Sequence, residues 1–131
     1  SAEAIPYTQA DEAKEFVSHT GIDALAIAVG TAHGIYTQSP HISIDTIRSV
    51  AGVVDIPLVM HGATGVTDGD IRASVNSGIR KINFFSGLLQ CAMDQVRGHS
   101  GCDNNDFLAF KARQTLAWQD LIEEQMLLYK G

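Results

Sequence analysis

Hydrophobic residues along this chain occur in two alternating patterns, one with helical spacing and one in short continuous runs. Thr8 and Asp11 resemble a capping box and open a stretch with helical spacing, and Gly21 is placed to end it. The apolar face of this expected helix carries Ala10, Ala13, Phe16 and Val17. Residues 23–30 then form an unbroken apolar run bounded by glycines, which predicts a strand buried on both faces.

The same order of helix and strand is expected twice more. Ser43 is the expected cap of the second helix, and Thr67 with Asp70 caps the third. The residues expected to face the core are Ile44, Ile47, Ala51, Ile71 and Val75. The glycines at 52 and 78 close these helices, and strands are predicted at 56–61 and 80–85.

The spacing of these elements predicts an α/β fold with a parallel sheet. The strands begin near residues 23, 56 and 80, and strands that alternate with helices at such intervals pair in parallel through right-handed crossovers. A (β/α)₈ barrel has about 30 residues in each unit. Three strands do not close a barrel, so we expect either a missing remainder or another chain to complete the fold.

The tail is expected to be helical. A helix is predicted at 87–97, a polar loop at 98–105, and a long amphipathic helix after it. The residues of this last helix that we expect in the core or in packing contacts are Phe107, Phe110, Trp118, Leu121 and Ile122.

Composition narrows the possible partners. The net charge is −6 and no run of Lys or Arg occurs, which argues against a nucleic-acid or anionic-membrane partner. An anionic ligand would need local backbone N–H groups and a metal. Cys91 and Cys102 fit no metal or redox spacing and read as free thiols. No membrane span or signal segment is recognisable, so the expected compartment is the cytoplasm.

Polar, glycine-rich segments follow all three predicted strands. Their sequences are GTAHG (30–34), HGATG (61–65) and NFFSG (83–87). Carboxyl ends of parallel strands form the sites of such folds, so His33 and His61 are expected on one rim, where a pair of imidazoles could bind a metal. The alternative is two separate, hydrogen-bonded loop histidines. His19, His41 and His99 read as surface residues.

A phosphate site is also indicated. The HGATG segment leads into the Thr67 cap and clusters backbone N–H groups before a helix, an arrangement that binds phosphate. Asn83 and Ser86 at the next strand end strengthen this interpretation, because barrels often place phosphate at their last two strands.

Three longer motifs overlap these polar segments: TGIDALAIAVGTAHG (20–34), PLVMHGATG (57–65) and GIRKIN (78–83). Together they resemble the class II, zinc-dependent ketose-bisphosphate aldolases, closest to the fructose- and tagatose-bisphosphate aldolase branch. They occur in the family's order, and the resemblance covers about residues 8–90. It implies that residues 1–131 form the C-terminal part of one (β/α)₈ TIM-barrel domain, with a helical C-terminal extension.

The resemblance also implies roles for individual residues. His33 and His61 would be two of three Zn²⁺ ligands. Contacts to the dihydroxyacetone phosphate part of the substrate would come from Gly34, Gly62, Ala63, Thr64, Asn83 and Ser86. Asn83 would also act near the reacting carbons. Backbone carbonyls of Ala32, Gly34 and Gly62 could hold Na⁺ or K⁺.

The implied reaction is aldol cleavage of a ketose bisphosphate, with zinc as Lewis acid. In the family, the third histidine, an acid/base Asp and a loop Glu lie upstream, so this segment is incomplete alone. A homo-oligomer or association with the missing half of the barrel is expected. Two alternatives stay open: a non-catalytic aldolase-like subunit, and a related metal-dependent lyase for another sugar. Thr64 replaces the more common Ser, and Phe84-Phe85 and Gly87 also depart from the family pattern.

Overall fold

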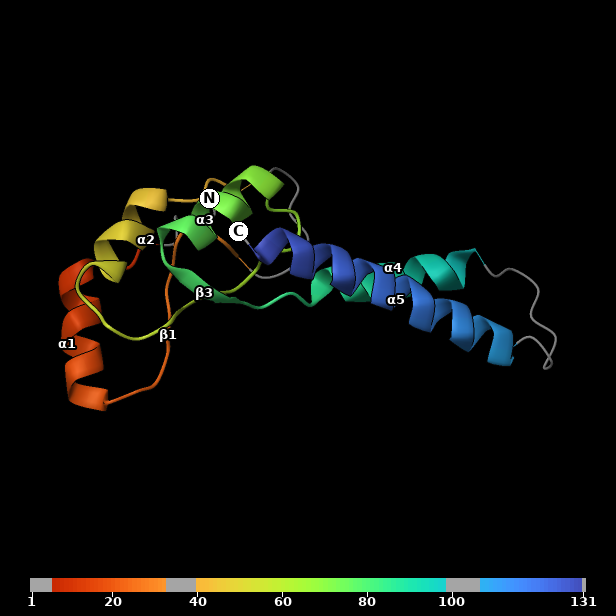
Figure 1. Cartoon of the computed structure of the whole chain (residues 1–131), viewed down its shortest axis with the longest axis horizontal. Coiled ribbons are helices and arrows are strands. Elements are labelled where there is room, and N and C mark those ends of the chain that lie inside the picture. Colours follow the sequence, from red (N-terminus) through yellow and green to blue (C-terminus); the bar gives the residue numbers. More distant parts are fainter. Residues whose placement is uncertain (1–5, 33–39, 99–106, 131) are drawn as a thin grey trace.

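Three parallel strands and five helices make up the described part of the chain. The computed structural model describes residues 6–32, 40–98 and 107–130. Its elements are α1 (Ala10–Thr20), β1 (Leu25–Ala26), α2 (Ile44–Ala51), β2 (Leu58–Met60), α3 (Asp68–Ser77), β3 (Ile79–Ile82), α4 (Ser86–Arg97) and α5 (Phe107–Tyr129). The strands form one parallel sheet in the order β1-β2-β3 (Figure 1). The predicted α/β alternation and the parallel pairing are therefore confirmed.

The hydrophobic core lies between this sheet and the helices α1, α2 and α3. Ile47 of α2 and Met60 of β2 are fully buried, and Ile71 of α3 is 2% exposed. Ile44, Ala51 and Val75, which were also expected to face inward, are partly buried. The helical spacing of apolar residues thus identified the inner faces of α2 and α3.

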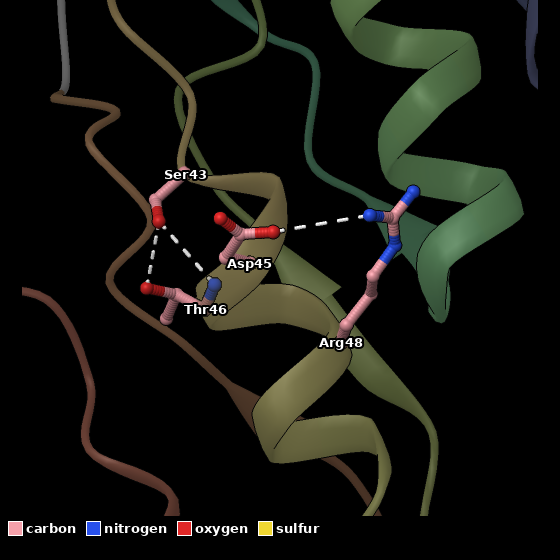
Figure 2. Close-up of polar contacts among 4 residues, drawn as sticks. All are labelled: Ser43, Asp45, Thr46 and Arg48. Atoms are coloured by element: carbon pink, nitrogen blue, oxygen red, sulfur yellow. Dashed lines mark hydrogen bonds and ion pairs between the residues drawn. The ribbon is translucent and has the colours of Figure 1, made fainter.

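The predicted caps of α2 and α3 are both present. The Ser43 hydroxyl accepts from the Thr46 backbone N–H at 3.3 Å and lies 2.8 Å from the Thr46 hydroxyl (Figure 2). Thr67 accepts from the Asp70 N–H at 3.2 Å and donates to its carboxylate at 2.8 Å. These side chains satisfy N–H groups that a helix start leaves unpaired.

The predicted cap at Thr8 is wrong. α1 begins one residue later, with Gln9 as N-cap and without a side-chain cap bond. The Thr8 hydroxyl instead accepts from the Ala28 N–H at 2.8 Å, and the Thr8 N–H donates to the Ala28 carbonyl at 3.0 Å. A tertiary contact to the chain after β1 has replaced the local one. Phe16, expected on the buried face of α1, is 52% exposed.

The first strand is not buried on both faces. Leu25, Ile27 and Val29 are buried, whereas Ala26 between them is exposed. Only one face of this run therefore contacts the core, and small alanines occupy the other face. Only Leu25–Ala26 is assigned as β1.

The register between β2 and β3 contains an irregularity that matters for the site. Leu58 pairs with Ile79, but the next residue, Val59, pairs with Lys81. Arg80 is therefore an extra residue on β3, as in a β-bulge. Because side chains alternate along a strand, the extra residue puts Lys81 on the sheet face of Val59, opposite the core face of Leu58 and Ile79.

Helices α4 and α5 form an antiparallel pair that extends away from the sheet (Figure 1). The Trp118 indole N–H of α5 donates to the Leu88 carbonyl of α4 at 3.0 Å. Phe107 and Trp118 were expected in the core or in packing contacts. They are 62% and 39% exposed and so lie outside the core, whereas Trp118 does contact α4. Ile122 is also exposed. Burial at the end of α5 raises the pKa of Tyr129 to about 12. None of the described helices has the length and apolar character needed to cross a membrane.

Candidate active site

His61 and Asn83 lie next to each other where β2 and β3 end. The Asn83 backbone N–H donates to the Met60 carbonyl at 2.9 Å, so the pairing of the two strands continues to these residues. Both side chains are half-buried. The carboxyl ends of parallel strands are where α/β folds collect their functional groups, and here one imidazole and one carboxamide meet.

The Asn83 side chain is held on both sides. Its amide nitrogen lies 3.1 Å from Nδ1 and 3.0 Å from Nε2 of His61. Its oxygen accepts a hydrogen bond from the Lys81 ammonium group. An NH₂ group only donates, so the imidazole is the acceptor in this contact.

A cleft of about 610 Å³ opens beside this pair. Its walls are formed by His61, Gly62, Thr64, Ile82, Asn83, Phe84, Phe85 and Ser86. The cleft therefore joins the two segments that follow β2 and β3, as expected from the sequence. Phe85 is 71% exposed and gives the cleft an apolar border.

One end of the cleft has the features of an anion site. The Thr64 hydroxyl oxygen accepts from the Gly87 backbone N–H at 3.0 Å, in the first turn of α4. This contact leaves the hydroxyl proton able to bond a further acceptor. Ser86 is the first residue of α4, whose start carries unpaired N–H groups and a partial positive charge.

The Ala63 side chain does not reach the cleft. It is 4% exposed and belongs to the hydrophobic core. Its carbonyl accepts from the Val66 N–H at 3.1 Å, which closes a tight turn before α3. Gly62 and Gly65 have positive φ angles of 68° and 86° in this segment. Any ligand contact from Ala63 would come from its backbone.

The expected metal site is described only in part. His33 and Gly34 lie outside the described residues, whereas Ala32 and His61 lie within them. Within residues 6–32, 40–98 and 107–130, no three His, Cys, Asp or Glu side chains are close enough to hold a metal ion together. His61 fits a zinc ligand by its residue type and by its position at the end of β2, and further ligands would have to come from outside the described residues.

Comparison with known proteins decides the family. The family model described as class-II fructose-bisphosphate aldolase matches residues 1–130. This chain belongs to the class II fructose-bisphosphate aldolase family. It is 45% identical over 91 residues to the Escherichia coli K12 protein YdjI, which is described as uncharacterized. That match covers 70% of this chain and 33% of YdjI.

Solved aldolase structures share the fold. The crystal structure of the YdjI aldolase superposes with a TM-score of 0.86 at 37% identity, over 94% of this chain and 46% of that one. A candidate fructose-1,6-biphosphate aldolase from Coccidioides immitis superposes with a TM-score of 0.86 at 25% identity, over 95% of this chain and 43% of that one. Fructose-bisphosphate aldolase from Campylobacter jejuni superposes with a TM-score of 0.67 at 18% identity, over 88% of this chain and 43% of that one. This class II aldolase chain therefore has the fold of the C-terminal part of an aldolase TIM barrel. It spans less than half the length of these relatives.

One polar residue beside the aldolase cleft was missed by the sequence reasoning. Lys81 donates to Asn83, and the signal that could have revealed it is its position two residues before Asn83 on the same strand. Such spacing places two side chains on one sheet face.

Proposed function

We propose that this chain supplies part of the active site of a zinc-dependent class II aldolase. The reaction is reversible cleavage of a ketose bisphosphate to dihydroxyacetone phosphate and an aldehyde. The observation that carries the proposal is the contact between His61 and Asn83 at the rim of a cleft that also contains Thr64 and Ser86. A candidate metal ligand, a candidate hydrogen-bond donor and a candidate anion site thus line one cavity.

His33 and His61 are the proposed zinc ligands from this chain. A catalytic zinc takes about three protein ligands and keeps an open position, so the third histidine belongs to the remainder of the barrel, as does the acid/base Asp. Bound zinc would supply a Lewis acid to the ketose carbonyl. The backbone carbonyls of Ala32, Gly34 and Gly62 are proposed to hold a Na⁺ or K⁺ ion beside it.

The substrate phosphate is proposed to bind between Thr64 and the start of α4. The Thr64 hydroxyl, which accepts from Gly87, would donate its proton to a phosphate oxygen. Ser86 and backbone N–H groups around Gly62 and Ala63 would add further donors, because helix starts and glycine-rich turns favour anions. These contacts offset the repulsion expected from a chain of net charge −6.

Asn83 is proposed to act on the reacting carbons. Breaking the C–C bond develops negative charge on the neighbouring oxygens, and a donor already aimed at them lowers the barrier. The NH₂ group of Asn83 points to the His61 side of the cleft. This direction supports the proposal that Asn83 donates to a substrate oxygen near the metal.

A coupled assay for dihydroxyacetone phosphate tests this proposal. The enzyme that contains this chain would be incubated with phosphorylated ketoses, with Zn²⁺ or with a chelator. We expect release of dihydroxyacetone phosphate that depends on zinc and is lost with the chelator. Failure of the zinc-loaded enzyme to cleave any ketose bisphosphate would reject the proposal.

A second candidate is a related metal-dependent lyase for another ketose phosphate. Phe84 and Phe85 line the cleft, and the exposed Phe85 ring borders the space next to Ser86. An apolar border favours a substrate with a less polar group there. Cleavage of a ketose monophosphate in preference to all bisphosphates in the same assay would support this candidate.

A further inference from the structure

The irregular register of β3 brings a cation to the site face of the sheet. Val59 pairs with Lys81 although Leu58 pairs with Ile79, so Arg80 is the extra residue. Asn83 follows Lys81 by two residues and shares its face of the strand. β-Bulges commonly turn a side chain toward a functional site. Here the bulge decides which face of the sheet carries Lys81 and Asn83, and their two-residue spacing brings the ammonium group to the carboxamide.

The Lys81–Asn83 contact determines which way the amide faces. An ammonium group has three donors and no acceptor, so it can bond only the oxygen of the carboxamide. Because the Asn83 oxygen accepts from the Lys81 ammonium group, the NH₂ group must face the opposite side, toward His61. A rotation of the amide by 180° would put NH₂ against the ammonium group and the oxygen against the imidazole.

We propose that Lys81 is a positioning residue that fixes the Asn83 amide with its NH₂ group toward the reacting oxygens. This inference rests on the proposed function, since it assigns Asn83 a donor role in aldol cleavage. Lys81 is exposed in the described chain, and an exposed hydrogen bond contributes little to folding. Its loss should therefore affect turnover far more than the melting temperature.

Arg80 provides a matched control on the same strand. It is also cationic and exposed, but its guanidinium group donates to the Val75 and Ile79 carbonyls at 2.9 and 3.2 Å. These partners are backbone groups at the end of α3 and the start of β3, away from the Asn83 amide. Arg80→Met removes a charge of the same sign without touching the proposed mechanism.

Steady-state kinetics of the zinc-loaded enzyme tests the proposal. Lys81→Met should lower kcat by about 10–100-fold, the usual loss for residues that orient a functional group, with little change in KM or zinc content. Lys81→Arg should recover most of the rate, because a guanidinium group can donate to the same oxygen. Arg80→Met should keep the wild-type kcat.

A double-mutant comparison separates positioning from direct action. If Lys81 acts through Asn83, Lys81→Met should cause no further loss of kcat when Asn83 is already replaced by alanine. An equal loss of kcat in both backgrounds, or a wild-type kcat in Lys81→Met, would overturn the proposal.

Nitrogen-15 NMR of the Asn83 side chain gives a readout that does not need turnover. The Asn83 NH₂ signal is the one missing from the spectrum of Asn83→Ala. It should shift in Lys81→Met and return toward its original position in Lys81→Arg. An unchanged signal in Lys81→Met would reject the positioning role, whereas a shifted signal with no cleavage by wild type would reject only the proposed aldolase reaction.

Discussion

At the scale of single residues, Asn83 is a polar group of the cleft held by three contacts. Its backbone N–H bonds Met60, its oxygen bonds Lys81, and its amide nitrogen contacts the His61 ring. A surface asparagine that only ended a strand would need the first of these contacts alone. The other two fix the direction in which the NH₂ group can donate.

The first prediction concerns Asn83→Ala. Because the donor is proposed to strengthen its bond as charge develops, its loss should lower kcat by about 10²–10³-fold. KM and zinc content should change little. The measurement is steady-state cleavage with bound zinc assayed in parallel. A near-normal kcat with zinc retained would remove Asn83 from the catalytic group.

The second prediction concerns Thr64→Val, which keeps the shape but removes the hydroxyl. The lost bond is to the phosphate, which does not change during cleavage, so mainly KM should rise while kcat is retained. Thr20→Val is the control, because its hydroxyl donates to the Phe16 carbonyl on the exposed face of α1. Unchanged KM in Thr64→Val would place the phosphate elsewhere.

The sequence allowed His61 and Asn83 to be placed on one rim because strand ends of a parallel sheet meet at one edge. Lys81 could have been paired with Asn83 from their two-residue spacing, but the face of the sheet on which both lie could not, since the extra residue at Arg80 cannot be read from hydrophobic alternation. The buried Ala63 side chain was equally hidden, because a glycine-rich segment does not show which of its Cβ atoms turns inward.

At the scale of elements, the helix starts were predictable where the capping side chain bonds its own helix. Ser43 and Thr67 do so, and both were found in their expected positions. Thr8 bonds Ala28 instead, and such a tertiary partner has no local sequence signal. The strands were predicted to be longer than they are, because the apolar runs continue beyond the residues that pair in the sheet.

The third prediction tests the cap of α2. Ser43→Ala should reduce the free energy of unfolding by about 1 kcal/mol, because the Thr46 N–H loses its acceptor. Ser18→Ala is the control, since Ser18 only donates to the Glu15 carbonyl within α1. Denaturant unfolding of the enzyme measures both. Equal stability of the two variants would show that the cap contributes nothing.

At the scale of the whole molecule, the described sheet has two outer strands, β1 and β3, and helices with apolar outer faces. Leu89, Met93 and Val96 of α4 are exposed at helical spacing. On α5 the exposed large apolar residues are Phe107, Leu108, Leu116, Trp118, Ile122, Met126 and Leu127. The aromatic residues of α5 were expected in the core or in packing contacts because their spacing is amphipathic, and spacing does not show which part of a fold covers a face.

The fourth prediction follows from these surfaces. The 131-residue chain should pair with a copy of itself or, when it is supplied, with the remainder of the barrel, or it should aggregate. The reason is that exposed strand edges and apolar faces promote association. Sedimentation velocity over a range of concentrations measures this. A single monomeric species that also melts cooperatively would contradict the expectation.

The most direct test of the account is the zinc content of His61→Ala, measured together with cleavage in the enzyme that contains this chain. His61 is proposed as a metal ligand, so its loss should abolish both bound zinc and release of dihydroxyacetone phosphate. His19→Ala, at an exposed position on α1 where the ring contacts the Glu15 carbonyl, should retain both. Stoichiometric zinc in purified His61→Ala would remove His61 from the ligand set and contradict the proposed site.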